Sequence, residues 1–363
     1  HALERIRAAI ALLDADPRAA QAFRFANRAM YLQRVRSLYA EAVRRGKQPD
    51  LGEIDVPANH SWRVFQLAFV LLNLPALADP THPERSDPSS ALADLLWFPT
   101  GGGKTEAYLG VAAFAMAIRR LQGEVGGRSG HAGVAVLMRY TLRLLTLQQF
   151  QRATALMCAC EVIRREAPSV WGSEPFRIGL WVGRNSTPNW TKDAAAAVRT
   201  LRGNYPYGGE STPHQLTNCP WRGRRIDPGR DIAVETAEQG AGRTLIYCGD
   251  PLGACPFSRK GAPGEGLPAL VVDEEIYRRL PSLLIATVDK FAQMPWNGRT
   301  AMLFGQVDGY CERHGYRSPE IEDSNSHPRK GAHPPARTLP MGPLRPPDLI
   351  IQDELHLISG PLG

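Results

Sequence analysis

The stretch Leu95-Leu96-Trp97-Phe98-Pro99-Thr100-Gly101-Gly102-Gly103-Lys104-Thr105 runs from a short apolar segment through three glycines into a lysine and a threonine. A series of helix formers follows it up to Leu121. A strand, a glycine-rich loop, Lys-Thr and a helix, in this order, predict a phosphate-binding P-loop. Glycines let backbone N–H groups approach phosphate oxygens without a Cβ in the way, and the helix points its positive end at the same anion.

The loop residues have separate expected roles in holding magnesium and a nucleotide. Lys104 brings a positive charge to the outer phosphates, and Thr105 offers a hydroxyl to Mg²⁺. Phe98 stands where the strict G-x-x-x-x-G-K-[ST] pattern has its first glycine, so a chance glycine-rich turn is the alternative. The residues that we expect to bind ATP here are Thr100, Gly101, Gly102, Gly103, Lys104 and Thr105.

A second motif, Asp353-Glu354-Leu355-His356, follows the apolar run of residues 349–352. Carboxylates at the carboxyl end of a buried parallel strand lie at the ligand-binding edge of the sheet. Asp353 is then suited to hold Mg²⁺ through water, and Glu354 to orient or deprotonate the attacking water. We therefore predict Glu354 and Lys104 as catalytic residues, with Thr105 and Asp353 as magnesium ligands.

Around these two motifs, short apolar runs alternate with helical segments. Residues 105–121 and 142–166 have helical patterns, and each follows an apolar run. Strand, helix, strand, helix predicts an α/β fold with a parallel sheet and flanking helices. The runs that we interpret as buried strands are residues 95–98, 134–140, 178–182, 283–288 and 349–352.

The rest of the chain adds a helical region and two interruptions. Asp16 before Pro17 predicts a helix start, and Gly46 predicts its end; the arginines between them fit a solvated helix face better than a DNA-binding face. Two regions interrupt the α/β pattern: residues 184–281, which are rich in glycine, proline and arginine, and residues 297–346, which are rich in proline. We divide the chain into an N-terminal helical region (1–60), a first ATPase part (61–183), an inserted cysteine-containing subdomain (184–281), an ATPase strand and helix (282–296), a proline-rich loop or arm (297–346) and the strand carrying Asp353 (347–363).

Composition sets broad limits on function. The chain has 363 residues, 43% of them hydrophobic, which is enough for a large core, and its formal net charge of +7 suits a polyanionic partner. No run is long and apolar enough to span a membrane, and six cysteines in this length do not indicate a disulfide scaffold. We expect a cytoplasmic protein. Because the chain starts at His1 and ends soon after the second motif, we also expect it to be a piece of a longer one.

Three cysteines of the inserted region, Cys219, Cys248 and Cys255, are candidate zinc ligands. The segment Cys219-Pro220-Trp221-Arg222-Gly223 is similar to a zinc knuckle, but Arg222 replaces its second cysteine. His214, or the pair Cys311 and His314, could complete the set; a degenerate knuckle with ordinary thiols is the alternative. Cys158 and Cys160 lie in an apolar helical segment, which favours buried free thiols.

Taken together, the two motifs resemble motifs I and II of superfamily 2 helicases of the DExH type. That resemblance implies a RecA-like ATPase domain, and it gives Gln66 the place of an adenine-reading glutamine, although a polar residue on an amphipathic helix is an equal alternative. Residues 139–143 and 286–291 resemble the strand-end motifs that hold nucleic-acid phosphates. The implied contacts, on the strand ends opposite the nucleotide, are Arg139, Thr141, Arg143, Thr287 and Lys290.

Residues 96–110, 137–146 and 280–292 resemble, more closely, the helicase subunit of the DISARM anti-phage system. The resemblance runs from about residue 60 to the end, and it implies defence against phage DNA with a second DISARM subunit as partner. The chain would be the first RecA-like domain of an ATP-dependent helicase or translocase. A second such domain would supply arginines for full activity. The alternative is an ATP-gated scaffold subunit, which the sequence beyond Gly363 would distinguish from a motor.

Overall fold

The computed structural model describes residues 1–97, 101–140, 143–203, 211–236, 242–321, 323–330 and 333–353, with only the backbone for residues 143–146. A five-stranded sheet in the order β14-β3-β8-β4-β7 forms its centre, and every neighbouring pair is parallel. This confirms the expected α/β fold with a parallel sheet. The strands are β3 (Val136–Tyr140), β4 (Ile178–Trp181), β7 (Ala269–Leu270), β8 (Leu283–Thr287) and β14 (Leu349–Gln352).

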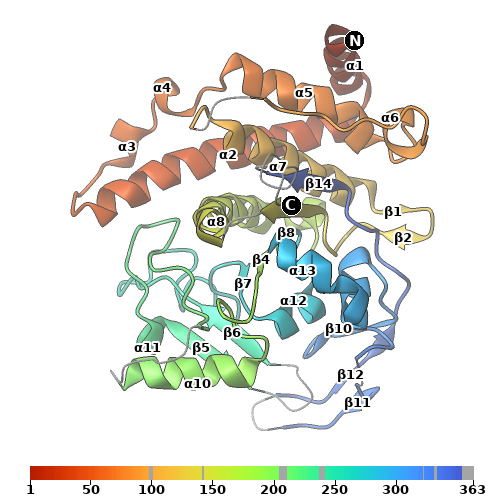
Figure 1. Cartoon of the computed structure of the whole chain (residues 1–363). Coiled ribbons are helices and arrows are strands. Elements are labelled where there is room, and N and C mark those ends of the chain that lie inside the picture. Colours follow the sequence, from red (N-terminus) through yellow and green to blue (C-terminus); the bar gives the residue numbers. More distant parts are fainter. Residues whose placement is uncertain are drawn as a thin grey trace, which may run out of the picture.

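Helices cover both faces of this sheet. Figure 1 shows α7 and α8 between the strands and the N-terminal helices. Apolar side chains of alternate strand positions pack against these helices, and the other positions pack against α12 and the turns that follow α13. The helices of this frame are α1 (Ala2–Ala15), α2 (Pro17–Arg44), α5 (Val64–Ala78), α7 (Lys104–Gln122), α8 (Arg143–Glu166), α12 (Asp273–Arg279) and α13 (Val288–Gln293).

Local signals set the ends of the longest helix, α2. The side chain of Asp16 accepts a hydrogen bond from the N–H of Arg18, and Pro17 occupies the first helical position. Gly46, just past the end of the helix, has a φ of 76°. These are the start and the stop that the sequence predicts, and the apolar stripe between them packs on α7 and α8.

The expected strand before the glycine loop is absent from residues 95–97, and Phe98 lies outside the described part. Leu95 and Trp97 are 70% and 83% exposed, although their apolar character predicts a buried strand. A strand needs a hydrogen-bonding neighbour, and residues 95–97 do not pair with any strand of the described residues. Among those residues β14 pairs only with β3, so the segment does not extend the sheet at its β14 edge.

Short elements make up the two interruptions and the remaining connections. Residues 184–281 contribute β7 and α12 to the central layers, as well as a hairpin with its own helices. These are α10 (Thr191–Arg202), α11 (Pro228–Asp231), β5 (Ile232–Glu235) and β6 (Arg243–Ile246). In 297–346 the elements are η3 (Gly298–Phe304), β9 (Gly309–Cys311), β10 (Gly315–Arg317), β11 (Ser326–His327), β12 (Ala336–Arg337) and β13 (Leu339–Pro340). The remaining ones are α3 (Leu51–Ile54), α4 (Pro57–His60), α6 (Pro83–Ser86), β1 (Glu124–Val125), β2 (Arg128–Ser129), α9 (Pro168–Trp171) and η2 (Met294–Trp296).

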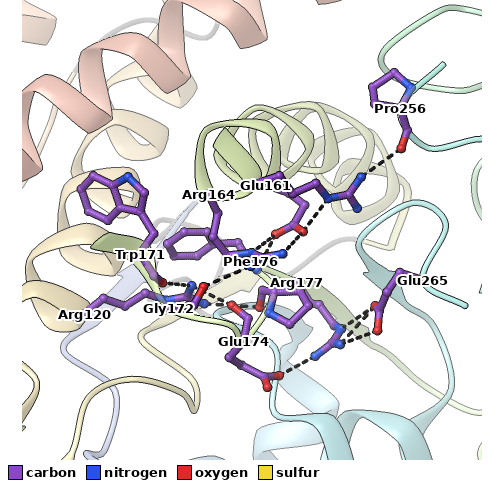
Figure 2. A network of polar contacts seen from close by, with 12 residues as sticks. Arg120, Glu161, Arg164, Trp171, Gly172, Glu174, Phe176, Arg177, Pro256 and Glu265 are labelled. Carbon is purple, nitrogen blue, oxygen red and sulfur yellow. Dashed lines mark hydrogen bonds and ion pairs between the residues drawn. The ribbon is translucent and has the colours of Figure 1, made fainter. Parts of the chain in front are cut away.

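Buried polar groups tie α7 and α8 to the loop before β4, as Figure 2 shows. The guanidinium of Arg120 donates to the carbonyls of Trp171 (2.8 Å) and Glu174 (2.7 Å), and lies 3.4 Å from the ring centre of Phe176. The carboxylate of Glu161, 1% exposed, accepts from two arginines of α8 and from the N–H of Phe176 at 3.1 Å. Each buried charge is thus hydrogen-bonded, which removes most of the cost of its burial.

A second buried network fixes the start of β14. The carboxylate of Asp348 accepts hydrogen bonds from Arg85 (2.8 Å), Arg119 (2.7 Å) and Arg345 (2.7 Å). Burial alone would raise the pKa of Asp348, but these arginines hold it below its ordinary value. Because β14 carries Asp353 at its other end, the network also sets where that carboxylate lies.

Candidate functional site

A pocket of about 680 Å³ opens where α7 begins. Its lining includes Gly101, Gly103, Lys104 and Thr105, as well as Asp353 from the end of β14. Both predicted motifs therefore contribute to one cavity, although 247 residues lie between Thr105 and Asp353 in the chain. The volume lies within the range of ordinary cofactor sites.

The glycine loop gives the pocket a helix N-terminus without a side-chain cap. Gly103 is the N-cap of α7, with a φ of 97°, and Gly101 has a φ of 79°. A Cβ on Gly103 would come within 2.7 Å of the Nε2 atom of Gln66, so a larger residue does not fit. The first N–H groups of the 19-residue helix α7 are thus available to an anion, and its dipole favours negative charge there.

Gln66 and Arg63 hold the backbone of this loop. The side-chain amide of Gln66 donates to the carbonyl of Gly103 at 2.8 Å, and its oxygen accepts from the N–H of Arg63 at 2.9 Å. Arg63 in turn donates to the carbonyl of Gly102 at 2.7 Å. Gln66 lines the pocket, as its proposed adenine contact requires, but its amide is engaged by the loop itself.

Asp353 and Glu106 are the two acids among the described residues that line the pocket. Asp353 directly follows β14, is 8% exposed, and its N–H donates to the carbonyl of Arg139 at 3.1 Å. Because β14 pairs with β3 in a parallel register, the backbone of Asp353 lies beside the carboxyl end of β3. Of the residues predicted to bind the nucleotide or to act in catalysis, Thr100 and Glu354 lie outside the described residues.

Those predicted nucleic-acid contacts that the structure describes, Arg139, Thr287 and Lys290, lie on the same edge of the sheet as Asp353, not on the opposite one. The reason is that β14, β3 and β8 are all parallel, with Tyr140 level with Thr287. Arg139 is half-buried, with its guanidinium 5.5 Å from the ring centre of Phe291. Thr141 and the side chain of Arg143 lie outside the described part of the chain.

Lys290 faces inward rather than toward solvent. It is 6% exposed, and its ammonium donates to the carboxylate of Asp273. Burial raises the pKa of Asp273 to about 6, although Lys290 opposes that shift. Beside this pair, a second cavity of about 660 Å³ is lined by Arg184, Thr287 and the 89% exposed Trp296.

The three cysteines of the inserted region meet. Cys219, Cys248 and Cys255 are all buried, and their sulfurs lie within 4.8 Å of one another. The sulfurs of Cys219 and Cys255 are 3.9 Å apart, close to the roughly 3.8 Å expected of two thiolates on one tetrahedral zinc ion. Arg222, at the place of a fourth thiolate, donates instead to the carbonyl of Ala254 at 3.3 Å.

The groups considered as completing that set lie elsewhere. The Nε2 atom of His214 is 3.1 Å from the carbonyl oxygen of Ile226, and His214 is not part of the cluster. Cys311 and His314 belong to a separate cluster. Cys158 and Cys160 are fully buried free thiols, as expected, and burial raises the pKa of both.

The chain is similar to a known protein along nearly its whole length. It is 41% identical over 372 residues to a DISARM protein DrmA of Bacillus paralicheniformis, in an alignment that takes in 99% of the chain. This similarity relates the chain to DISARM protein DrmA. The chain spans only 31% of the length of that relative. No family model matches the chain, and none of the helices in its described residues has the length and apolarity of a membrane span.

One wall of this pocket comes from residues that the sequence analysis does not single out. Asn27, Tyr31 and Arg34 of α2 line it, as do Trp62 and Arg152. Asn27 accepts a hydrogen bond from the indole of Trp62 at 2.8 Å, and Arg152 forms an ion pair with Glu106 of α7. The packing of α2 against α7 and α8 brings the three α2 residues to the loop.

Proposed function

We propose that the chain is the first RecA-like domain of an ATP-dependent helicase or translocase of superfamily 2. The observation that carries the proposal is the single pocket that combines the uncapped start of α7, Lys104 and Thr105 with Asp353. A cation, a hydroxyl, a carboxylate and free backbone N–H groups are the donor and acceptor set that a magnesium–nucleotide complex needs.

The residues present fit magnesium and ATP. Loop N–H groups and Lys104 hold the phosphates, and Thr105 and Asp353 hold Mg²⁺, directly or through water. When bound, ATP supplies the phosphoanhydride bond whose hydrolysis drives motion. Gln66 and Arg63 hold the loop in shape for the phosphates, since their side chains bind two of its carbonyls. Glu354 acts on the attacking water.

Nucleic acid lies along the carboxyl edge of the sheet, beyond the nucleotide. Arg139 and the Arg184 side chain offer charge there, Thr287 a hydroxyl, and the exposed ring of Trp296 a stacking surface. The hydroxyl of Thr287 is buried without a hydrogen-bond partner among the described residues. The excess of positive charge supports the same assignment.

The similarity to DISARM protein DrmA supports a role in a DISARM system, with a second DISARM subunit as partner. The further parts of the proposal are DNA as the polymer, antiphage defence as the purpose and the cytoplasm as the setting. A second RecA-like domain completes the catalytic centre, because transition-state charge needs further cations. Separately, Cys219, Cys248 and Cys255 hold a structural zinc ion with a fourth donor other than Arg222.

Equilibrium binding of a fluorescent ATP analogue, with and without Mg²⁺, tests the nucleotide assignment. Lys104→Ala should weaken magnesium-dependent binding about 10- to 100-fold, the loss expected for one charged hydrogen bond. Lys192→Ala, which removes an exposed lysine of α10, is the matched control and should bind normally. Equal affinity in both variants would overturn the assignment of this pocket.

A further inference from the structure

A second cluster of metal-ligating side chains lies in residues 297–346, apart from the nucleotide pocket and from the three cysteines. Cys311 ends β9, His314 lies in the turn before β10, and His327 belongs to β11. One ligand atom of each lies within 4.8 Å of the other two. Figure 1 shows β10, β11 and β12 close together in the blue part of the chain.

All three side chains are buried. Cys311 is 1% exposed, His327 6% and His314 9%. The Nδ1 atom of His314 is buried and has no hydrogen-bond partner among the described residues. The two imidazole rings meet edge to face, with their centres 4.1 Å apart. A buried imidazole whose Nδ1 atom has no hydrogen-bond partner among the described residues, beside a second imidazole and a buried thiol, is costly unless something binds between them.

The hydrogen bonds of the neighbouring Thr338 favour one tautomer of His327. The Thr338 hydroxyl has a single proton, which it donates to the carbonyl of Ser324 at 3.1 Å. It must therefore accept from the Nε2 atom of His327, which lies 3.0 Å away. The proton of the neutral ring then sits on Nε2, and the lone pair of Nδ1 is left free as a ligand.

His314 has a comparable partner in Asp323. Its Nδ1 atom lies 3.8 Å from Oδ2 of Asp323, whose side chain is 2% exposed and accepts a 2.8 Å hydrogen bond from Arg278 of α12. A carboxylate behind the non-ligating nitrogen is the usual outer-shell arrangement of a metal-bound histidine. A contraction of about 0.6–1 Å would turn this contact into a hydrogen bond and leave Nε2 for a metal.

The turn that carries Cys311 and His314 has the spacing of a metal knuckle. Two residues separate the ligands, and Gly315 follows with a φ of 87°. A Cβ on Gly315 would lie 2.1 Å from the carbonyl oxygen of Arg278, so the glycine packs the turn directly onto α12. The turn and Asp323 are thus both anchored to the same helix.

The composition of the neighbouring segment explains why it needs an anchor. Residues 323–337 contain no hydrophobic side chain larger than alanine and proline. Such a segment buries too little apolar surface to offset the entropy of ordering it. Its one buried ring, His327, is also the member that would join it to the β9–β10 hairpin through a metal.

We propose that Cys311, His314 and His327 bind a zinc ion, with Asp323 and Thr338 as the outer oxygens that orient the two histidines. One thiolate and two imidazoles form a ligand set that zinc favours, with the fourth position filled by water or another donor. The ion joins the β9–β10 hairpin to β11. It is separate from the three-cysteine cluster and independent of ATP binding.

Metal content per chain, measured by mass spectrometry after gel filtration, tests the proposal. Cys311→Ser and His327→Ala should each lose one zinc equivalent relative to the wild type. His333→Ala, which removes an exposed histidine of the same segment, should lose none. Cys219→Ser in combination with Cys311→Ser distinguishes the two clusters, because the losses should add if each cluster holds its own ion.

Two further measurements keep the proposal testable if a variant folds poorly. His327→Cys keeps a ligand and should retain the zinc; with cobalt in its place, the thiolate-to-cobalt absorption should grow. In the wild type, a chelator should speed amide hydrogen exchange in residues 309–317 and 323–327, and zinc should reverse this. Unchanged zinc content in both Cys311→Ser and His327→Ala, or copper in place of zinc, would overturn the proposal.

Discussion

The side-chain amide of Gln66 donates a 2.8 Å hydrogen bond to the carbonyl of Gly103, the residue that starts α7. A residue from the helix before the loop thus fixes the backbone at which phosphates are proposed to bind. Gln66→Ala should weaken nucleotide binding about 2- to 10-fold, the usual net contribution of one hydrogen bond. Isothermal titration with an ATP analogue measures it, with Gln306→Ala, an exposed glutamine elsewhere, as the control. Full affinity without Gln66 would mean that the loop holds its shape unaided.

Gly103 and Gly101 form a matched pair within the same loop. Both have positive φ, but a Cβ on Gly103 meets Gln66 at 2.7 Å, whereas nothing lies within 4 Å of one on Gly101. Gly101→Ala should therefore cost only the backbone strain, about 1–2 kcal/mol, while Gly103→Ala should also displace the loop and lose nucleotide binding. Thermal melting and nucleotide titration separate the two effects. Equal losses of binding would show that strain alone accounts for both.

The two acids should divide their work. Asp353→Asn should weaken magnesium-dependent nucleotide binding, because the amide is a poorer ligand than the carboxylate. Glu354→Gln should keep that binding and stop hydrolysis, since an amide can hold a water molecule but cannot act as a base. Titrations with and without Mg²⁺, together with phosphate release, distinguish the variants. Equal loss of binding in both would contradict this division.

Arg139 and Lys290 should behave differently, although the sequence groups them together. Arg139→Ala should lower single-stranded DNA affinity alike for unrelated sequences and flatten the logarithmic salt slope by about 0.7. Lys290→Ala should instead destabilise the fold by about 3–5 kcal/mol, because it leaves Asp273 buried without its partner. Fluorescence anisotropy at several salt concentrations and denaturant unfolding test the pair, with Arg199→Ala on the exposed face of α10 as the control. A slope unchanged by Arg139→Ala would move the DNA path elsewhere.

Much of the central sheet could be predicted from apolar runs, because a buried parallel strand is apolar on both faces. The run predicted at residues 349–352 forms β14, and the run predicted at 283–288 forms β8, which is one residue shorter. Residues 95–97 are also an apolar run, but they do not form a strand. A strand also requires a hydrogen-bonding partner, and the apolar run alone does not show whether one is present. The two-residue strand β7 is too short to leave any periodic signal.

The candidate sites, too, contain residues that the sequence could predict and residues that it could not. The glycine loop and Asp353 were predictable because each motif sits on a local strand or helix signal. The buried position of the Lys290 side chain was not predictable, because it depends on the ion pair with Asp273. Asp273 lies in helix α12, which the sequence analysis did not predict. His327 likewise lies beside Cys311 and His314 only because of how a segment without regular periodicity folds. The spacing of possible ligands in the sequence therefore did not predict it.

Steady-state ATP hydrolysis by the full-length protein, with and without single-stranded DNA, tests the proposed ATPase site most directly. We predict DNA-stimulated turnover in the wild type. In Lys104→Ala we predict turnover near the background rate and an unchanged melting temperature, because Lys104 is proposed to contact phosphate and does not belong to the buried core. Near-normal turnover in a folded Lys104→Ala variant would contradict the assignment of this pocket as an ATPase site.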